Sequence, residues 1–133
     1  HSDSSAASDV YKRQAKANDA VVTLAMIETK EALDNVAEIV ATPGLTGIYV
    51  GPSDLSLSLG YGPGMDHTRP EMVDAIMAIR DACKAAGVKV GIHCGTTAYA
   101  RDMIAEGFDL TTISSDLRAY AAAMGQITTD MRA

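Results

Sequence analysis

Apolar residues recur along the chain with two different spacings, which predict strands and helices in alternation. Almost continuous apolar runs, typical of strands buried on both faces, occupy residues 21–27, 46–50, 88–93 and 108–114. Apolar residues that return every three or four positions, as on one face of a helix, occupy residues 30–40, 70–86, 97–106 and 117–131. Strict alternation of strand and helix predicts a parallel sheet with right-handed crossovers.

Several helix positions are expected to face the core. In the third helical stretch, Ala100, Met103 and Ile104 share the inward face. The methionines at helical spacing, from Met72 to Met131, are interpreted as core residues, since a flexible thioether fills irregular gaps.

Two α/β architectures fit this pattern, a small doubly wound sheet and part of a (β/α)8 barrel. A complete barrel needs about 250 residues, whereas the chain has 133. Four βα units would therefore be half of a barrel. The barrel reading is favoured by the N-terminal residues, which suggest that the chain is a piece of a longer protein.

Residues 1–14 show neither helical nor strand spacing and are expected to lack regular structure. Residues 4–14, SSAASDVYKRQ, resemble the translation of a transposase-type sequencing adapter read in frame. The predicted division is therefore an adapter-derived, disordered segment at 1–14 and a domain at 15–133, which would be the C-terminal half of its fold.

Composition excludes several partners. The formal net charge of −6 argues against binding to nucleic acid or to an anionic membrane, because like charges repel. No apolar run approaches the roughly 20 residues of a membrane span. The 2 cysteines are too few for a disulfide framework, and reduced thiols in a cytoplasmic protein are expected.

Two carboxylates follow neighbouring apolar runs. Glu28 comes directly after the first run, and Asp54 follows the Gly51–Pro52 turn after the second. Ligands bind at the carboxyl ends of parallel strands, and adjacent strands lie about 4.8 Å apart. The two side chains could therefore share Mg²⁺ or Mn²⁺, completed by water and a chelating substrate. In the alternative interpretation, Glu28 caps the next helix and Asp54 caps a turn.

Other candidates have simpler interpretations. The amides of Ser53 and Asp54 are free to meet an anion such as a carboxylate. His93 ends the third run and is interpreted as a hydrogen-bonded structural residue, with a general base as the alternative. His67 is expected to be exposed, and Cys94 to be a small buried thiol. Ser114 and Ser115 are expected to cap the helix that follows them.

Two segments carry a family resemblance. Residues 26–62, MIETKEALDNVAEIVATPGLTGIYVGPSDLSLSLGYG, and residues 87–116, GVKVGIHCGTTAYARDMIAEGFDLTTISSD, closely resemble the HpcH/HpaI aldolase family. These are class II pyruvate aldolases related to citrate lyase β. The pairing of IET with GPSDLSLSLG favours the branch of 4-hydroxy-2-oxoheptanedioate and 2-keto-3-deoxy-sugar-acid aldolases over the acyl-CoA lyase branch.

The resemblance implies a TIM barrel of the phosphoenolpyruvate/pyruvate-binding type and an aldehyde-lyase activity. A 4-hydroxy-2-oxo acid would be cleaved to pyruvate and an aldehyde through a metal-bound enolate. Glu28 and Asp54 match the family's metal ligands for Mg²⁺, Mn²⁺ or Co²⁺. The stretch of Gly51, Pro52, Ser53 and Asp54 matches the loop that holds the pyruvate carboxylate. Family members are cytoplasmic homo-oligomers, often hexamers, in which the C-terminal helix, here residues 117–131, packs on a neighbouring subunit.

No residue of the chain is assigned as general base, because the family's catalytic His and carboxylate-binding Arg lie in the other half of the barrel. Three hypotheses follow. The chain is a truncated, inactive part of a metal-dependent aldolase, a non-catalytic α/β module that binds metal or anion, or a non-enzymatic stub whose two open strand edges pair with other chains.

Overall fold

A parallel four-stranded sheet forms the centre of the computed structural model, which describes residues 3–133. The strands lie side by side in chain order: β1 (Leu24–Ile27), β2 (Gly47–Val50), β3 (Lys89–Cys94) and β4 (Leu110–Ile113). Each pairs in parallel with the next. All four predicted strands are present. β1, β2 and β4 are shorter than their apolar runs, and β3 is shifted by one residue toward the C-terminus.

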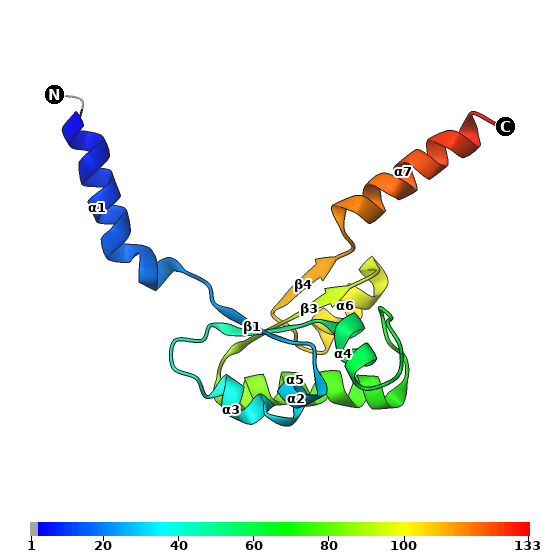
Figure 1. Ribbon diagram of the computed structural model, residues 1–133, viewed down its shortest axis with the longest axis horizontal. Helices are drawn as coiled ribbons and strands as arrows, with labels where there is room; N and C mark the ends of the chain where they lie inside the picture. Colours follow the sequence, from blue (N-terminus) through cyan, green and yellow to red (C-terminus); the bar gives the residue numbers. More distant parts are fainter. Residues whose placement is uncertain (1–2) are drawn as a thin grey trace.

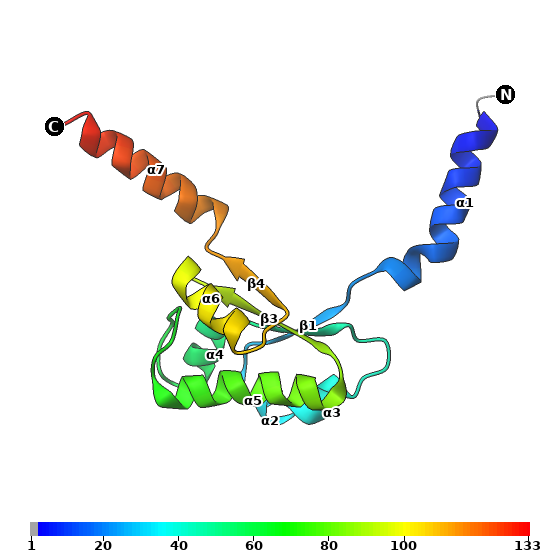
Figure 2. The same ribbon diagram turned by 180° about the vertical axis from the view of Figure 1, so that it is seen from behind.

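Helices follow the strands, as the alternation predicted. Their bounds are α1 (Asp3–Ala20), α2 (Lys30–Asp34), α3 (Val36–Val40), α4 (Pro52–Ser58), α5 (Pro70–Ala86), α6 (Thr97–Ala105) and α7 (Asp116–Asp130). Figures 1 and 2 show α2, α3 and α5 lying along the sheet, while α1 and α7 project away from it at opposite sides.

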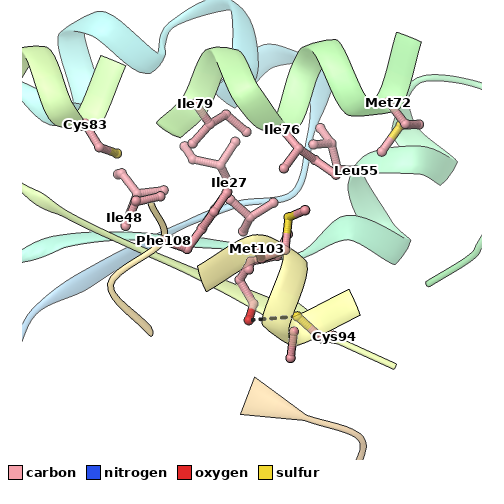
Figure 3. Close-up of a cluster of buried hydrophobic side chains, with 14 of the residues drawn as sticks. Ile27, Ile48, Leu55, Met72, Ile76, Ile79, Cys83, Cys94, Met103 and Phe108 are labelled. Atoms are coloured by element: carbon pink, nitrogen blue, oxygen red, sulfur yellow. Dashed lines mark hydrogen bonds between the residues drawn. The ribbon is translucent and has the colours of Figure 1, made fainter. Parts of the chain in front are cut away.

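One face of the sheet carries the core. Alternate strand residues that share this face are fully buried: Ile27, Ile48, Val50, Val90, Ile92 and Cys94. They form one cluster with buried side chains of α3 to α6, and α5 supplies more of these than any other helix. Figure 3 shows the α5 side chains Met72, Ile76 and Ile79 directed toward this cluster. Burial of this apolar surface is the main contribution to folding.

The opposite face of the sheet is uncovered by helices within the described residues. It carries Met26 and Leu110, which are 53% and 44% exposed. The prediction that the strands are buried on both faces is therefore wrong for this chain. A doubly wound sheet is also excluded, because it would have helices on both faces. Strands in sequential order with helices on one face form an arc of a (β/α)8 barrel, whose interior would be the uncovered face.

The N-terminal segment differs from its prediction. From Asp3 onward it is helical, and α1 continues to Ala20 across the predicted boundary at residue 15. Apolar periodicity could not indicate this helix, because α1 stands away from the sheet (Figure 1) and its Val10 and Tyr11 side chains are exposed. Its alanines favour a helix through local backbone propensity alone. Residues 1 and 2 lie outside the described residues, and the adapter origin stays a prediction.

The second helical stretch is broken in two. Asn35 separates α2 from α3, with backbone angles of φ −102° and ψ 12°. Its side-chain amide donates a hydrogen bond of 2.8 Å to the Glu31 carbonyl oxygen. Such local side-chain bonding competes with helix continuation. The end of α5, by contrast, is as predicted, because Gly87 adopts the left-handed conformation with φ 71°.

Asp109 joins the amino-terminal end of β4 to β3 through hydrogen bonds. Its carboxylate accepts hydrogen bonds from Lys89 Nζ at 2.9 Å, from the Val90 amide at 3.1 Å and from Lys84 Nζ at 3.2 Å. The Lys89 contact is the largest cause that lowers the pKa of the Asp109 carboxyl from 3.8 to about 2. This end of a barrel is typically concerned with stability rather than with chemistry.

Asp109→Asn is expected to lower the free energy of unfolding by about 1 kcal/mol at neutral pH, a modest value because solvent screens the partly exposed lysines. The folded-state pKa lies below the unfolded value, so the stabilisation is complete above pH 3.8 and is lost as the pH falls through about 2. Urea unfolding of both chains across this range measures it. Asp102→Asn, an exposed change on α6, is the control, and a pH-independent difference would contradict the prediction.

Candidate active site

Glu28 lies at the carboxyl end of β1, half-buried and directly after Ile27. The next residue, Thr29, caps α2, since its side-chain oxygen accepts a hydrogen bond of 3.1 Å from the Ala32 amide. The alternative in which Glu28 caps this helix is therefore wrong. Its carboxylate remains available at the rim of the sheet.

Asp54 lies in the first turn of α4, a helix that the sequence did not predict. Gly51 is the N-cap without a side-chain capping bond, and Pro52 occupies the first helical position, for which its missing N–H and fixed φ are suited. The Gly51 amide donates to the Ile27 carbonyl oxygen at 3.1 Å, which joins the start of α4 to β1. Asp54 thus lies beside the end of the neighbouring strand, as its sequence position predicted.

A pocket of about 250 Å³ opens at this end of the sheet. Its lining includes all five predicted site residues, Glu28, Gly51, Pro52, Ser53 and Asp54, together with Met26, Tyr49, Met65 and His93. The roles of the five stay predictions, but the structure does bring them together.

The two pocket carboxylates suit a hard cation. Among the residues that the structure describes, neither the Glu28 nor the Asp54 carboxylate has a cationic partner. No group of three or more His, Cys, Asp or Glu side chains is placed to hold a metal in that part of the chain. The donor set is therefore two hard oxygen ligands, which fits Mg²⁺ or Mn²⁺ with water and substrate in the other positions.

Backbone amides accompany these carboxylates. Leu55 makes the first helical hydrogen bond of α4, from its amide to the Gly51 carbonyl oxygen at 3.0 Å. Pro52 has no N–H, so Ser53 and Asp54 carry the first-turn amides that have no acceptor within the helix. Donors of this kind bind anions, as the sequence predicted for a carboxylate.

A glycine-rich loop between α4 and α5 closes one side of the pocket. Asp66 accepts hydrogen bonds from the Gly95 amide at 2.6 Å and from the Thr96 hydroxyl at 2.7 Å, which ties the loop to the start of α6. His67 was expected to be exposed, but it is half-buried, and its Nε2 lies 3.2 Å from the Pro52 carbonyl oxygen. Nothing in the sequence pattern indicated these partners of Asp66 and His67.

His93 faces the pocket and belongs to a polar cluster that the sequence did not reveal. Its Nδ1 lies 2.8 Å from Thr112 Oγ1, and the same hydroxyl contacts the Tyr49 phenol oxygen. The three side chains come from three neighbouring strands. Strand alternation could have placed them on one face, but their direct contact depends on the three-dimensional register.

Cys94 cannot act as a nucleophile in this environment. It is fully buried, and burial raises the pKa of its thiol to about 11, so the reactive thiolate is scarce at neutral pH. Cys83 is also buried, and its burial is the largest cause that raises the pKa of its thiol to about 11. Of the two serines predicted to cap a helix, Ser115 does so. Its side-chain oxygen accepts a hydrogen bond of 3.3 Å from the Arg118 amide at the start of α7.

The fold and the pocket together define a segment of a parallel β/α barrel with an acidic site at the carboxyl ends of its strands. Residues 4–123 match the family model of HpcH/HpaI aldolase/citrate lyase. The chain belongs to this family, as the resemblance indicated. The match begins within residues 1–14, and the predicted boundary at residue 15 stays a prediction.

Comparison with individual proteins places the chain in the same family. The chain is 47% identical over 119 residues to a hydroxypyruvate/pyruvate aldolase of Rhizorhabdus wittichii, covering 90% of this chain and 47% of that protein. Its fold matches the crystal structure of an HpcH/HpaI aldolase/citrate lyase family protein from Burkholderia cenocepacia with a TM-score of 0.81 and 35% identity, covering 91% and 46% of the two chains. A citrate lyase β subunit from M. tuberculosis, complexed with oxaloacetate and magnesium, matches with a TM-score of 0.60 and 25% identity, covering 72% and 45%.

The chain therefore spans about half the length of the relatives that it matches. No described helix is both long enough and apolar enough to cross a membrane.

Proposed function

We propose that this chain supplies part of the active site of a metal-dependent aldolase that cleaves a 4-hydroxy-2-oxo acid to pyruvate and an aldehyde. The observation that carries the proposal is the convergence of Glu28 and Asp54 in one pocket, next to the first-turn amides of α4. The named relative, a hydroxypyruvate/pyruvate aldolase, supports the reaction class. The magnesium complex of the citrate lyase β subunit supports a divalent cation.

Each group of the pocket has a part in this proposal. The carboxylates of Glu28 and Asp54 hold Mg²⁺, Mn²⁺ or Co²⁺, and the amides of Ser53 and Asp54 donate to the substrate carboxylate. Gly51 and Pro52 hold these amides in place at the end of β2. The cation supplies a fixed positive charge where negative charge develops on the keto oxygen. Since the resemblance places the base and an arginine in the other barrel half, the 133-residue chain alone is expected to be inactive.

Pyruvate release from 4-hydroxy-2-oxoheptanedioate by the complete gene product tests the proposal. A chelator is expected to abolish release, and added Mg²⁺, Mn²⁺ or Co²⁺ to restore it. Metal-independent turnover would refute it. If bound Mn²⁺ is unaffected by pyruvate and no turnover occurs, the chain belongs instead to a non-catalytic metal-binding module.

We also propose that α7 packs on a neighbouring subunit of a cytoplasmic homo-oligomer, a hexamer as in the family. The helix carries an apolar stripe with alternating spacings of three and four residues, which is typical of a helix that packs on another. Its members are 43% to 83% exposed within the chain: Leu117, Tyr120, Met124, Ile127 and Met131. The prediction of a core role is therefore wrong for the last two methionines, Met124 and Met131.

Ile127→Glu is expected to reduce the oligomer of the complete gene product to smaller species, because a charge would be buried in an apolar contact. Ala122→Glu is the matched control, since it lies on the opposite side of α7 from the stripe. Light scattering after size-exclusion chromatography measures the mass. An unchanged mass for Ile127→Glu would contradict the packing of α7 on another subunit.

A further inference from the structure

Three polar side chains form a chain of contacts across the uncovered face of the sheet. Tyr49 on β2 contacts Thr112 on β4 through their hydroxyl groups, and Thr112 Oγ1 lies 2.8 Å from His93 Nδ1 on β3. Tyr49 thus reaches over β3 to a strand that is not its neighbour in the sheet.

Gly91 makes this crossing possible. It pairs with Tyr49 on one side and with Leu110 on the other. A Cβ atom at Gly91 would lie 3.1 Å from Tyr49 Cδ2, closer than ordinary van der Waals contact. A side chain at this position would push the Tyr49 ring away from β3. The glycine therefore leaves room for the ring to lie over the strand and place its hydroxyl beside Thr112.

Two directions are possible for the hydrogen bonds that join Tyr49, Thr112 and His93. If Tyr49 donates to Thr112, and Thr112 donates to His93 Nδ1, each hydroxyl proton has an acceptor. In the reverse direction, Nδ1 and Thr112 donate, and the Tyr49 proton has no acceptor within the part of the chain that the structure describes. We favour the first direction, because it gives every proton a protein acceptor, whereas in the second the Tyr49 hydroxyl would donate to solvent in the pocket. The first direction requires the proton of a neutral imidazole to be on Nε2.

His93 lies at the same level of the sheet as Glu28 and lines the same pocket as Glu28 and Asp54. Ile27, Val50 and Ile92 are consecutive partners in register, so the residues that follow them, Glu28, Gly51 and His93, lie at one level across three adjacent strands. Gly51 has no side chain, and a Cβ there would lie 3.2 Å from Glu28 Oε2. Glu28 and His93 line the same pocket, with backbones about 10 Å apart at two strand spacings. Gly51 lines the same pocket, whose volume is about 250 Å³.

We propose that His93 is a substrate-binding residue whose Nε2–H donates to an oxygen atom in the part of the substrate that extends away from Glu28. The proposal rests on the proposed aldolase function, in which Glu28 and Asp54 lie at the 2-oxo acid end. The other end of the substrate derives from the aldehyde. His93 therefore favours aldehydes that carry a hydroxyl oxygen over alkyl aldehydes of similar size, and Tyr49 and Thr112 are positioning residues that hold its tautomer.

The tautomer is tested in the 133-residue chain by ¹⁵N NMR of the imidazole at about pH 8.5, where an ordinary histidine is neutral. The expected signature is a protonated Nε2 and an accepting Nδ1. Thr112→Val and Tyr49→Phe are expected to shift His93 toward a mixture of tautomers. Thr111→Val, on the opposite face of β4, is the matched control and leaves the signature unchanged. A wild-type signature with the proton on Nδ1 would overturn the chain of hydrogen bonds.

Selectivity is tested in the complete gene product, with pyruvate as donor and glycolaldehyde or propanal as acceptor. His93→Leu is expected to reduce kcat/KM for glycolaldehyde at least about 10-fold more than for propanal, chiefly through KM. His93→Gln, which keeps an N–H donor, is expected to recover part of this ratio. An active enzyme with an unmoved ratio overturns the role of His93 alone. A protein without pyruvate aldolase turnover overturns the proposed function and this role together.

Discussion

Asp54→Asn is expected to weaken Mn²⁺ binding to the chain by about 100-fold, because it removes one of two charged oxygen ligands. Glu28→Gln is expected to have an effect of similar size. Both residues line the same pocket, and the nearest alternative role for Glu28, the cap of α2, is filled by Thr29. The loss should therefore reflect the cation site rather than a damaged helix. Electron paramagnetic resonance of unbound Mn²⁺ during titration measures the affinity.

Asp102→Asn is the matched control for this loss. It removes the same charge from an exposed position on α6 that is not part of the pocket lining, so it is expected to leave Mn²⁺ affinity within about 2-fold, as weak screened electrostatics allow. Circular dichroism of all three variants checks that the fold is retained. Equal affinities of Asp54→Asn and the unchanged chain would show that Asp54 is not a metal ligand.

The pocket could be predicted because its residues obey a local rule. Glu28 and Asp54 each follow an apolar strand, and strand ends in a parallel sheet meet at one edge. The polar cluster behind His93 obeys no such rule, since Tyr49 reaches Thr112 only because β3 presents a glycine between them. Strand alternation indicates which face a side chain occupies, but a contact that skips a strand also depends on register, which a single sequence does not give.

Helix content was harder to predict than strand content. The sequence predicted one helix where Asn35 divides α2 from α3, and a loop where α4 begins at Pro52. In both places a local hydrogen bond or a fixed φ decides the outcome. Ile104 was expected to face the core but is 57% exposed. Its periodicity fits a buried face, yet no neighbour among the described residues covers that side of α6.

Gly47→Ala is expected to have the largest effect on stability, a loss of about 3 kcal/mol or more in the free energy of unfolding. A Cβ atom at Gly47 would lie 2.2 Å from the Lys89 carbonyl oxygen and 2.7 Å from its carbonyl carbon. Both are backbone atoms of the neighbouring strand, so relief requires β2 and β3 to separate. These two strands are the centre of the sheet, and their residues Ile48 and Val90 are fully buried in the core.

Urea unfolding followed by circular dichroism measures this loss, with Gly125→Ala as the control. Gly125 lies within α7, and a Cβ atom there meets nothing within 4 Å, so alanine is expected to stabilise that helix by up to about 1 kcal/mol. An added methyl group is thus expected to lower the free energy of unfolding at Gly47 and to raise it at Gly125. If Gly47→Ala proved as stable as the unchanged chain, β2 and β3 could not approach each other as closely as the register of this sheet requires.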